Sequence, residues 1–479
     1  MSDPARRSAA DSDAIRDRTD LIGQLSVGCE LEQGLCLQYL FTAFTLKDSL
    51  SEGLTLDELS TVRKWKANIF LVAAQEMLHL AQVANLLAAV GGTVQLQRPN
   101  FPQSKFYYPT LLPWGLFPFS RETVRLYALY ERPAKPRDED ARLLGAADAL
   151  ALEDVQLSAA EEATLYHEDP ALWLEKLPHS YLPQRHLGKR AKAARHVTTI
   201  GELYGAIGQA FATLCPPPAG ELIIGSPRAQ VDGELIDFPQ ILKVADRQAA
   251  AAAVDLIVRQ GEGAPADRSD SHFGIFVDIL HEYDRLKQAR PAFEPSRDVH
   301  PNPLSRLHVD NSFPGWRLIA DDFTRDVNDL ASDVYQSMML MLYRFFATAD
   351  EEPAQRRILA RTAIYTMTTA IKPLGEALTR LPMGDEPSPG AIPRPQFAGP
   401  SFEINRSIQL LPFQDSAWIA MHERLLELAQ RASALSVDPR GAEPGHGGAA
   451  LDLEAAAATL TRIAGEFGVQ AQRITSQGS

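Results

Sequence analysis

The sequence predicts a mainly all-α protein, in which a four-helix bundle with an irregular insertion is followed by a second helical domain. Three observations lead to this prediction. Residues 21–50 and 57–90 are long segments with apolar residues at helical spacing, joined by a short turn. Glu76 and His79 share the apolar face of the second segment, as they do in metal-binding bundles. Beyond residue 325 the chain again consists of helical segments separated by loops.

These features divide the chain into four predicted parts. A disordered leader, the bundle, a crossing segment and a C-terminal helical domain are expected over residues 1–18, 19–290, 291–325 and 326–475. Within the bundle, the insertion covers about residues 93–198.

Composition and charge narrow the class of protein. The net charge of −14 and the lack of a long basic stretch argue against a nucleic-acid partner. The three cysteines have neither disulfide-framework nor zinc-ligand spacing, and the polar start of the chain shows no secretory signal. We therefore expect a cytoplasmic protein. We also expect no membrane partner, because we predict that no uninterrupted apolar segment reaches the length needed to span a bilayer.

The first predicted helix contains two acids, and helical spacing distinguishes them. Glu32 shares its face with apolar and aromatic neighbours: Leu25, Cys29, Leu35, Cys36 and Tyr39. Glu30 has glycine and polar neighbours and is expected on the more polar side. Glu32 is thus predicted to point inward, whereas Tyr39 is interpreted as core packing.

The second predicted helix begins with acids at Asp57 and Glu58 and stops at Gly91-Gly92. Glu76 lies in a stripe of Ile69, Val72, Ala73, Leu80 and Val83. An unpaired carboxylate in such a stripe would be very costly, so it must be neutralised, paired or bound to a metal. Antiparallel packing of the first two helices would place Glu32 beside Glu76 and His79.

The predicted insertion changes character along its length. Its first part is rich in proline and aromatic residues without helical period, and RETVRLYALYERP then predicts a short amphipathic helix. Two further short helices are expected at LLGAADALALED and ALWLEKL. We interpret the insertion as a lid or wall over one end of the bundle.

The third predicted helix starts at Thr198-Thr199 and carries Glu202. Two roles are open for Glu202, since Thr199-Ile200-Gly201-Glu202 is also a capping box. Residues 219–240 predict a small hairpin with VDGEL as its turn, and DRQAAAAAVDLIVRQ predicts a helix that ends near Glu262. Glu262 is either a reserve ligand or, as we favour, a loop acid.

The fourth predicted helix of the bundle offers two histidines. Asp278 and His281 have the acid-x-x-His spacing, but their neighbours form a polar, water-facing stripe. His272 instead shares a face with Ile275, Phe276, Ile279, Tyr283 and Leu286. We therefore predict His272, and not His281, at the site.

Several ordered motifs resemble the bacterial ferritin-like family. They are ELEQGLCLQYLFTAFTLK, QEMLHLAQVANLLAAVGG, PFSRETVRLYALYERP, TIGELYGAIGQA, RQGEG and SHFGIF, spread over roughly residues 20–290. This family includes the ferritin-like region of the imine-dimer synthases of violacein and indolocarbazole (chromopyrrolic acid) biosynthesis. The resemblance implies a ferritin-like four-helix bundle, and it implies coupling of tryptophan-derived imines as one activity.

The predicted metal ligands combine carboxylates with imidazoles: Glu32, Glu76, His79, Glu202 and His272. Oxygen ligands with imidazole suit iron or manganese. We expect one or two iron ions (Fe2+/Fe3+), with manganese and haem as less favoured alternatives.

The leading functional hypothesis is a non-haem iron oxidase or oxygenase of specialised metabolism. It would use dioxygen on a small organic, amino-acid-derived substrate held between the bundle and the insertion. An imine-dimer synthase is the alternative among enzymes, and a non-catalytic metal-binding or scaffold protein is the alternative of another class. The hypothesis also allows a homodimer.

Overall fold

A computed structural model describes most of the 479 residues. The described ranges are 15–103, 112–134, 159–167, 199–215, 220–236, 238–261, 268–307, 315–347, 350–384, 396–405 and 411–477. The two short helices expected at LLGAADALALED and ALWLEKL lie outside them, as do Glu262 and most of the predicted leader.

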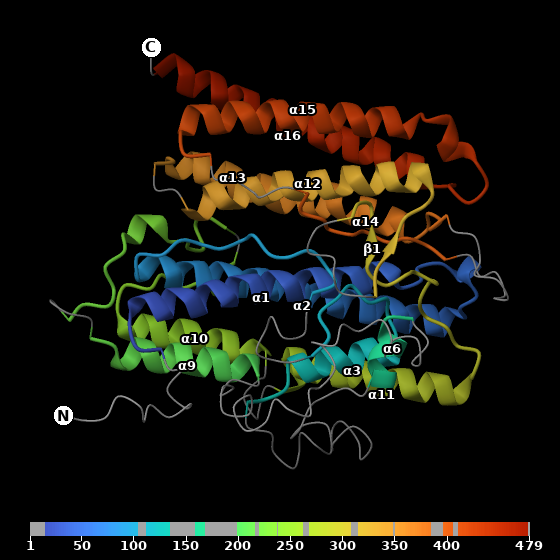
Figure 1. The fold of residues 1–479 in the computed structure, drawn as a ribbon, viewed down its shortest axis with the longest axis horizontal. Helices are drawn as coiled ribbons and strands as arrows, with labels where there is room; N and C mark the ends of the chain where they lie inside the picture. The colour runs from blue at the N-terminus through green and yellow to red at the C-terminus, as the bar shows by residue number, and fades with distance from the viewer. Residues whose placement is uncertain are drawn as a thin grey trace.

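The described helices form a stack of layers (Figure 1). α15 and α16 lie at one edge, α12, α13 and α14 come next, and α1 and α2 form the middle of the molecule. The layer beyond α1 and α2 contains α3, α9, α10 and α11. The bounds are α1 Arg18–Thr45, α2 Leu56–Ala89, α3 Arg121–Tyr130, α6 Ala159–Leu165, α9 Ile200–Thr213, α10 Arg247–Gly261, α11 His272–Ala289, α12 Asp322–Ala347, α13 Pro353–Thr366, α14 Lys372–Leu378, α15 Gln414–Ser436 and α16 Ala449–Gln477.

Local signals set the ends of the central pair. Thr55 and Glu58 form a capping box at the start of α2. At its other end Gly91 adopts a φ of 86°, and the Gly92 N–H donates to the Leu87 carbonyl over 2.8 Å. The predicted stop at Gly91-Gly92 is therefore confirmed.

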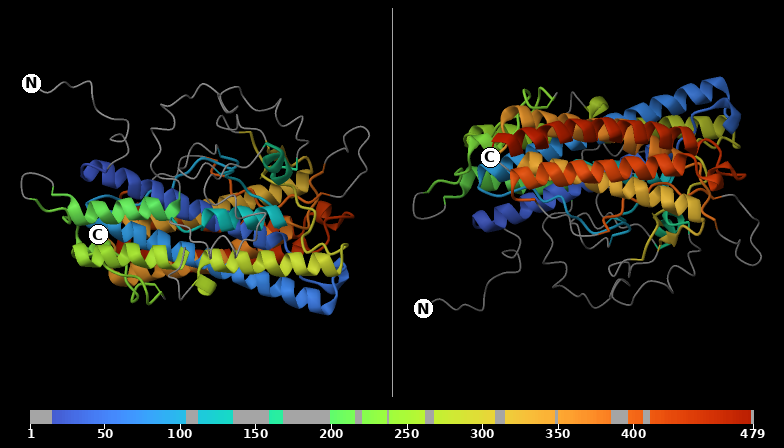
Figure 2. Two further views of the ribbon diagram at one scale, coloured as in Figure 1. Left: turned by 90° about the horizontal axis from the view of Figure 1, so that it is seen from below. Right: turned by 90° about the horizontal axis from the view of Figure 1, so that it is seen from above.

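The third and fourth helices of the bundle are each split in two. Seen from below, α9 lies in line with α3, and α10 lies in line with α11 (Figure 2). As a result four helix ends meet against the middle of α1 and α2: the ends of α3 and α10 and the starts of α9 and α11. This junction positions the candidate site.

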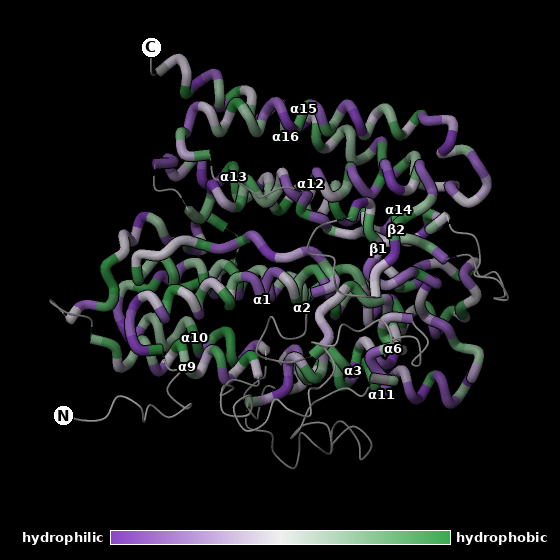
Figure 3. Tube along the Cα trace, in the orientation of Figure 1, coloured by the Kyte–Doolittle hydropathy of each residue, from purple (hydrophilic) through white to green (hydrophobic). Residues whose placement is uncertain are grey.

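The second half packs directly on the bundle. Buried apolar residues of α1 and α2 and of α12–α16 belong to one continuous core. The outer helices α15 and α16 alternate hydrophilic and hydrophobic residues, as expected for helices with one buried face (Figure 3). The predicted domain boundaries remain predictions.

A π-helical turn, Met367–Ile371, joins α13 to α14. Proline at position 373 has no N–H to donate to the Thr369 carbonyl four residues earlier. That carbonyl instead accepts the Thr459 hydroxyl of α16 over 3.3 Å. Such π-helical turns often lie at functional sites.

The crossing segment ties the two halves together. Arg297 is buried and donates to the Phe44 and Leu46 carbonyls at the end of α1, and it also pairs with Glu52. Two short parallel strands, β1 Pro303–Leu304 and β2 Arg317–Leu318, follow it.

The hairpin predicted within residues 219–240 is corrected, and two further findings differ from the sequence analysis. The described part of 219–240 contains a 3-10 turn, Pro227–Ala229, and no paired strands; its Ile224 and Gly225 amides donate to the Ala89 carbonyl at the end of α2. α6 was not expected from the sequence. By length and composition α2 could span a membrane, but 72% of its most apolar window is buried, as in a core helix.

Candidate metal centre

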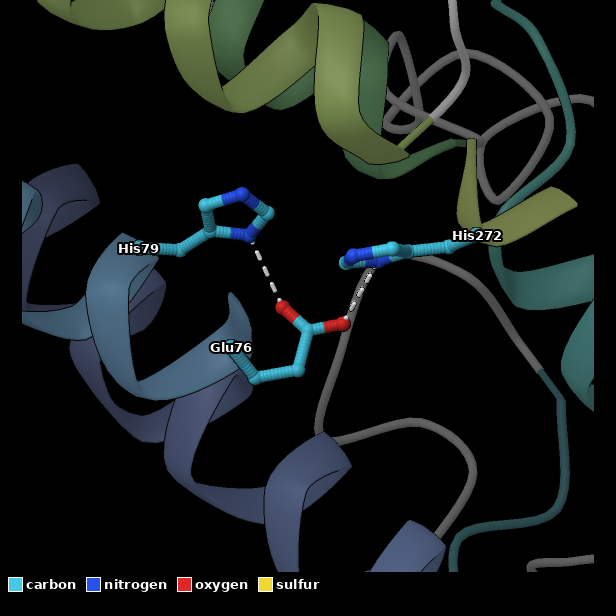
Figure 4. Close-up of side chains that lie close together, drawn as sticks. All are labelled: Glu76, His79 and His272. Carbon is cyan, nitrogen blue, oxygen red and sulfur yellow. Dashed lines mark hydrogen bonds and ion pairs between the residues drawn. The ribbon is translucent and has the colours of Figure 1, made fainter. Parts of the chain in front are cut away.

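Five buried side chains form one cluster where the helix ends meet α1 and α2. Glu76 stands at its centre, with Oε2 2.9 Å from Nδ1 of His79 and Oε1 3.0 Å from Nδ1 of His272 (Figure 4). Each Nδ1 also faces a second carboxylate: Glu32 Oε2 lies 3.5 Å from His79, and Glu131 Oε2 lies 3.5 Å from His272. Each imidazole therefore faces Glu76 and one further carboxylate.

The outer nitrogens of both imidazoles are held by glutamine oxygens. Nε2 of His79 lies 2.9 Å from Oε1 of Gln260, and Nε2 of His272 lies 3.1 Å from Oε1 of Gln75. An amide oxygen only accepts, so each Nε2 carries the hydrogen. In the neutral ring Nδ1 then presents its lone pair to the carboxylates, which is the orientation of a metal ligand.

Two tyrosines hold the outer carboxylates. The Tyr204 hydroxyl donates to Oε1 of Glu32, and the Tyr39 hydroxyl donates to Oε1 of Glu131. Each outer carboxylate thus keeps Oε2 turned toward an imidazole. Tyr39, interpreted from the sequence as core packing, in fact contacts a carboxylate of the cluster.

The pKa values show how strongly these groups interact. Burial and the charge of Glu76 raise the pKa of Glu32 to about 8, and the same two causes raise the pKa of Glu131. Burial would also raise the pKa of Glu76, but His272 and His79 outweigh it and hold that pKa well below its usual range. For His272 burial is outweighed by Glu76 and Glu131, which raise its pKa to about 9. Without a metal, protons bound to the imidazoles and to the outer carboxylates thus reduce the repulsion among the three buried carboxylates.

Two features of the cluster fit a bound cation. Glu76 Oε1 and His272 Nδ1 are buried, and neither makes a well-directed hydrogen bond to any described residue. A void of about 20 Å³ lies among Glu32, Glu76, His79 and Glu131, and it is large enough for about one water-sized group. Metal ions bind such groups by displacing their protons.

The structure brings together four of the five residues predicted from the sequence: Glu32, Glu76, His79 and His272. It places Glu202 in the capping role, with its carboxylate accepting the Thr199 N–H over 3.2 Å, and it does not bring Glu202 into the cluster. Metal ligation by all five remains a prediction. His281 is exposed on α11, in agreement with the predicted polar face.

Glu131 is the cluster residue that sequence reasoning missed. It is the C-terminal cap of α3, just beyond the apolar period of that helix, and it is only 4% exposed. It lies in the sequence YERP, directly after the last helical turn, where no helical face indicates the direction of its side chain.

An apolar cavity of about 380 Å³ reaches the cluster from the side of the second half. Glu32 and Glu76 line one end, and the walls come from α1, α2, α12, α13 and the π-helical turn. No described residue of 93–198 lines it. This cavity lies between the two halves of the chain, and the expected substrate position under the insertion remains a prediction.

We predict that the glutamine contacts tune metal affinity. Gln260→Leu removes the acceptor for His79 Nε2, so the ring loses the hydrogen bond that orients it. Metal affinity should fall about 10- to 100-fold, as for other outer partners of ligating histidines. Competition with a chelator for Fe2+ or Mn2+ measures this.

Gln248→Leu is the matched control, because Gln248 is exposed near the start of the same helix. Equal affinities for the two variants would mean that Gln260 does not act on the site.

Comparison with known proteins gives three findings. A family model described as ferritin-like matches residues 25–281. The chain is 24% identical over 458 residues to the dichlorochromopyrrolate synthase of Lentzea aerocolonigenes, covering 89% of this chain and 40% of that protein. It is 26% identical over 391 residues to the 2-imino-3-(indol-3-yl)propanoate dimerase of Chromobacterium violaceum, covering 77% and 33%.

Among solved structures, the fold is similar to a ferritin-like protein from Caulobacter vibrioides, with 18% identity and a TM-score of 0.39. That match covers 71% of this chain and 93% of the other. The chain spans only 40% and 33% of the lengths of the two curated relatives.

Proposed function

The chain belongs to the ferritin-like family, and from this premise we propose that it is a non-haem iron oxidase or oxygenase acting on a small, largely apolar organic molecule. One observation carries the proposal. A buried cluster of three carboxylates and two imidazoles, with Glu76 Oε1 and His272 Nδ1 lacking well-directed partners, forms the end of an apolar cavity.

The pairing of the side chains favours two ions. His79 with Glu32 would hold one, His272 with Glu131 would hold the other, and Glu76 would be shared between them. A symmetric di-iron bundle has a second Glu-x-x-His, but residue 269, three before His272, is serine. The described set is therefore one carboxylate short of the symmetric one.

The donor set suits iron or manganese, and we propose iron because the chain belongs to the ferritin-like family. Carboxylate oxygens with imidazoles suit iron and manganese, and neither Cys29 nor Cys36 is among the groups that meet at the cluster. Bound iron would supply redox chemistry with dioxygen, which the protein's own side chains cannot supply.

The side chains around the site do the remaining tasks. The apolar cavity walls would hold an apolar molecule beside Glu32 and Glu76. The Tyr204 and Tyr39 hydroxyls hold Glu32 and Glu131 in place and lie where they can exchange protons with them.

The three free cysteines favour a cytoplasmic setting for such a protein.

Metal analysis tests the proposal. Protein produced with an iron supply should carry about one or two iron ions per chain. After anaerobic reduction it should consume dioxygen when air is admitted, and removal of iron by a chelator should abolish that uptake. Protein that binds no iron on reconstitution would contradict the proposal, and a Soret band would identify haem instead.

Imine coupling is the second candidate function, because the two curated relatives are an imine dimerase and a dichlorochromopyrrolate synthase. Supplying 2-imino-3-(indol-3-yl)propanoate, formed in situ by oxidation of tryptophan, tests it. A coupled dimer detected by mass spectrometry, and absent without the protein, would favour coupling. Substrate-dependent dioxygen uptake without a dimer would favour the oxidase.

A further inference from the structure

The cavity contains a polar side chain that the metal cluster does not use. Gln33 of α1 is adjacent to Glu32 in the sequence, lines the cavity and is only 5% exposed. Its Nε2 donates to the Tyr335 hydroxyl of α12 over 2.6 Å. Its Oε1 is buried and has no hydrogen-bond partner among the described residues.

The contacts of Gln33 define which end of its amide is free. Nε2 lies 3.6 Å from Sδ of Met339 as well as beside Tyr335. A thioether sulfur can accept a hydrogen bond but cannot donate one, so the amide nitrogen belongs on this side. The amide oxygen, Oε1, therefore remains without a hydrogen-bond donor among the described residues. A buried acceptor without a partner is costly, and a ligand that supplies a donor would remove that cost.

The rest of the cavity selects for apolar surface. Apart from Glu32, Glu76, Gln33 and Tyr335, the walls are almost entirely aliphatic, aromatic and methionine side chains. Thr368 of the π-helical turn and Lys372 at the start of α14 are exposed polar residues at the edge of the cavity. Binding sites of this kind place a few polar groups in an apolar pocket to orient the ligand. The methionines of α12 can adapt to ligands of different shape.

We propose that this cavity binds an apolar molecule with one hydrogen-bond donor, which Gln33 Oε1 accepts. The site rests on the proposed function in so far as this molecule is the substrate. Gln33 and Glu32, both on α1, line the same cavity, so a molecule bound through Gln33 shares the cavity with a carboxylate of the cluster. α12 supplies Tyr335 and Met339, so both halves of the chain determine which molecules fit.

A matched pair of probes tests the inference on the full-length protein. 2-Naphthol has a donor, and 2-methoxynaphthalene has the same ring system without one. We expect fluorescence titration to show that the naphthol binds about three- to tenfold more tightly than the ether, the value of one hydrogen bond. Gln33→Leu, which keeps the volume and removes the amide, should abolish this preference.

Two variants complete the test. Thr368→Val changes another polar wall residue, whose hydroxyl already donates to backbone carbonyls of α13, and it should keep the preference. Ala360→Phe, from the α13 wall, should fill the cavity and weaken the binding of both probes. Equal binding of the two probes to the unmodified protein, or an unchanged preference in Gln33→Leu, would overturn the inference.

The iron content of each variant is measured in parallel, which separates this inference from the proposed function. A Gln33-dependent preference in protein that cannot bind iron would retain the ligand site and reject the oxidase. Iron-loaded protein that binds the two probes equally would retain the proposed oxidase and reject the ligand site.

Discussion

Replacing Glu76 and His79 together by alanine should reduce the bound metal to less than about a tenth of its value in the unmodified protein. Glu76 faces both imidazoles, and His79 faces both Glu76 and Glu32, so the double change removes one ligand from one half of the cluster and the shared carboxylate from both. Metal ligands act together, so the loss should exceed the 10- to 100-fold expected for an outer partner. Elemental analysis after iron reconstitution measures it.

Asp278→Ala with His281→Ala is the matched control. This pair has the same acid-x-x-His spacing on α11, but both side chains are exposed. The control should keep its iron and its dioxygen uptake. If the Glu76/His79 variant, shown to be folded by circular dichroism, retained full activity, the protein would instead be a scaffold or a non-metal protein.

Replacing Glu351 by alanine should lower the free energy of unfolding by about 3–5 kcal/mol, the cost of breaking a buried ion pair. Glu351 is fully buried, and its Oε1 lies 2.5 Å from Nε of Arg344, which is also buried. It also accepts the Trp418 indole N–H over 3.1 Å and the Gln414 side-chain amide over 2.9 Å. The change therefore leaves the Trp418 indole N–H without its acceptor and removes the buried carboxylate partner of the Arg344 guanidinium, where α12, α13 and α15 meet.

Asp350→Ala provides the comparison for this experiment. Asp350 pairs with the same Arg344 over 2.7 Å, but its side chain is 49% exposed. The loss should stay below about 1 kcal/mol, because water replaces an exposed partner. Chemical denaturation followed by circular dichroism measures both variants. Equal losses would show that burial does not control the strength of these pairs.

Much of the fold follows from local signals in the sequence. The long helices of both halves have a clear apolar period, and their ends carry capping residues or glycines that act within one turn. The inward position of Glu32 and of His272 also follows from helical spacing, because a residue's face is defined by neighbours three and four positions away. For the same reason His281 could be assigned to the polar face.

Other features depend on contacts between segments far apart in the chain. Glu131 follows the last turn of α3, where no helical face predicts its direction, and it is buried because α11 places His272 beside it. The choice between ligand and cap for Glu202 likewise needed the position of the start of α9 relative to the cluster. The apolar period of one helix does not indicate which residues of another helix it will contact.

The sequence by itself therefore determined the long helices, the central Glu76-x-x-His79 element and the two companions that share a buried helical face, Glu32 and His272. The tertiary structure decided that the third and fourth helices are split, that their ends bring Glu131 to the cluster, and that the cavity lies between the two halves. The physical reason is range: caps and apolar periods act over a few residues, whereas this cluster and cavity arise from packing between helices hundreds of residues apart.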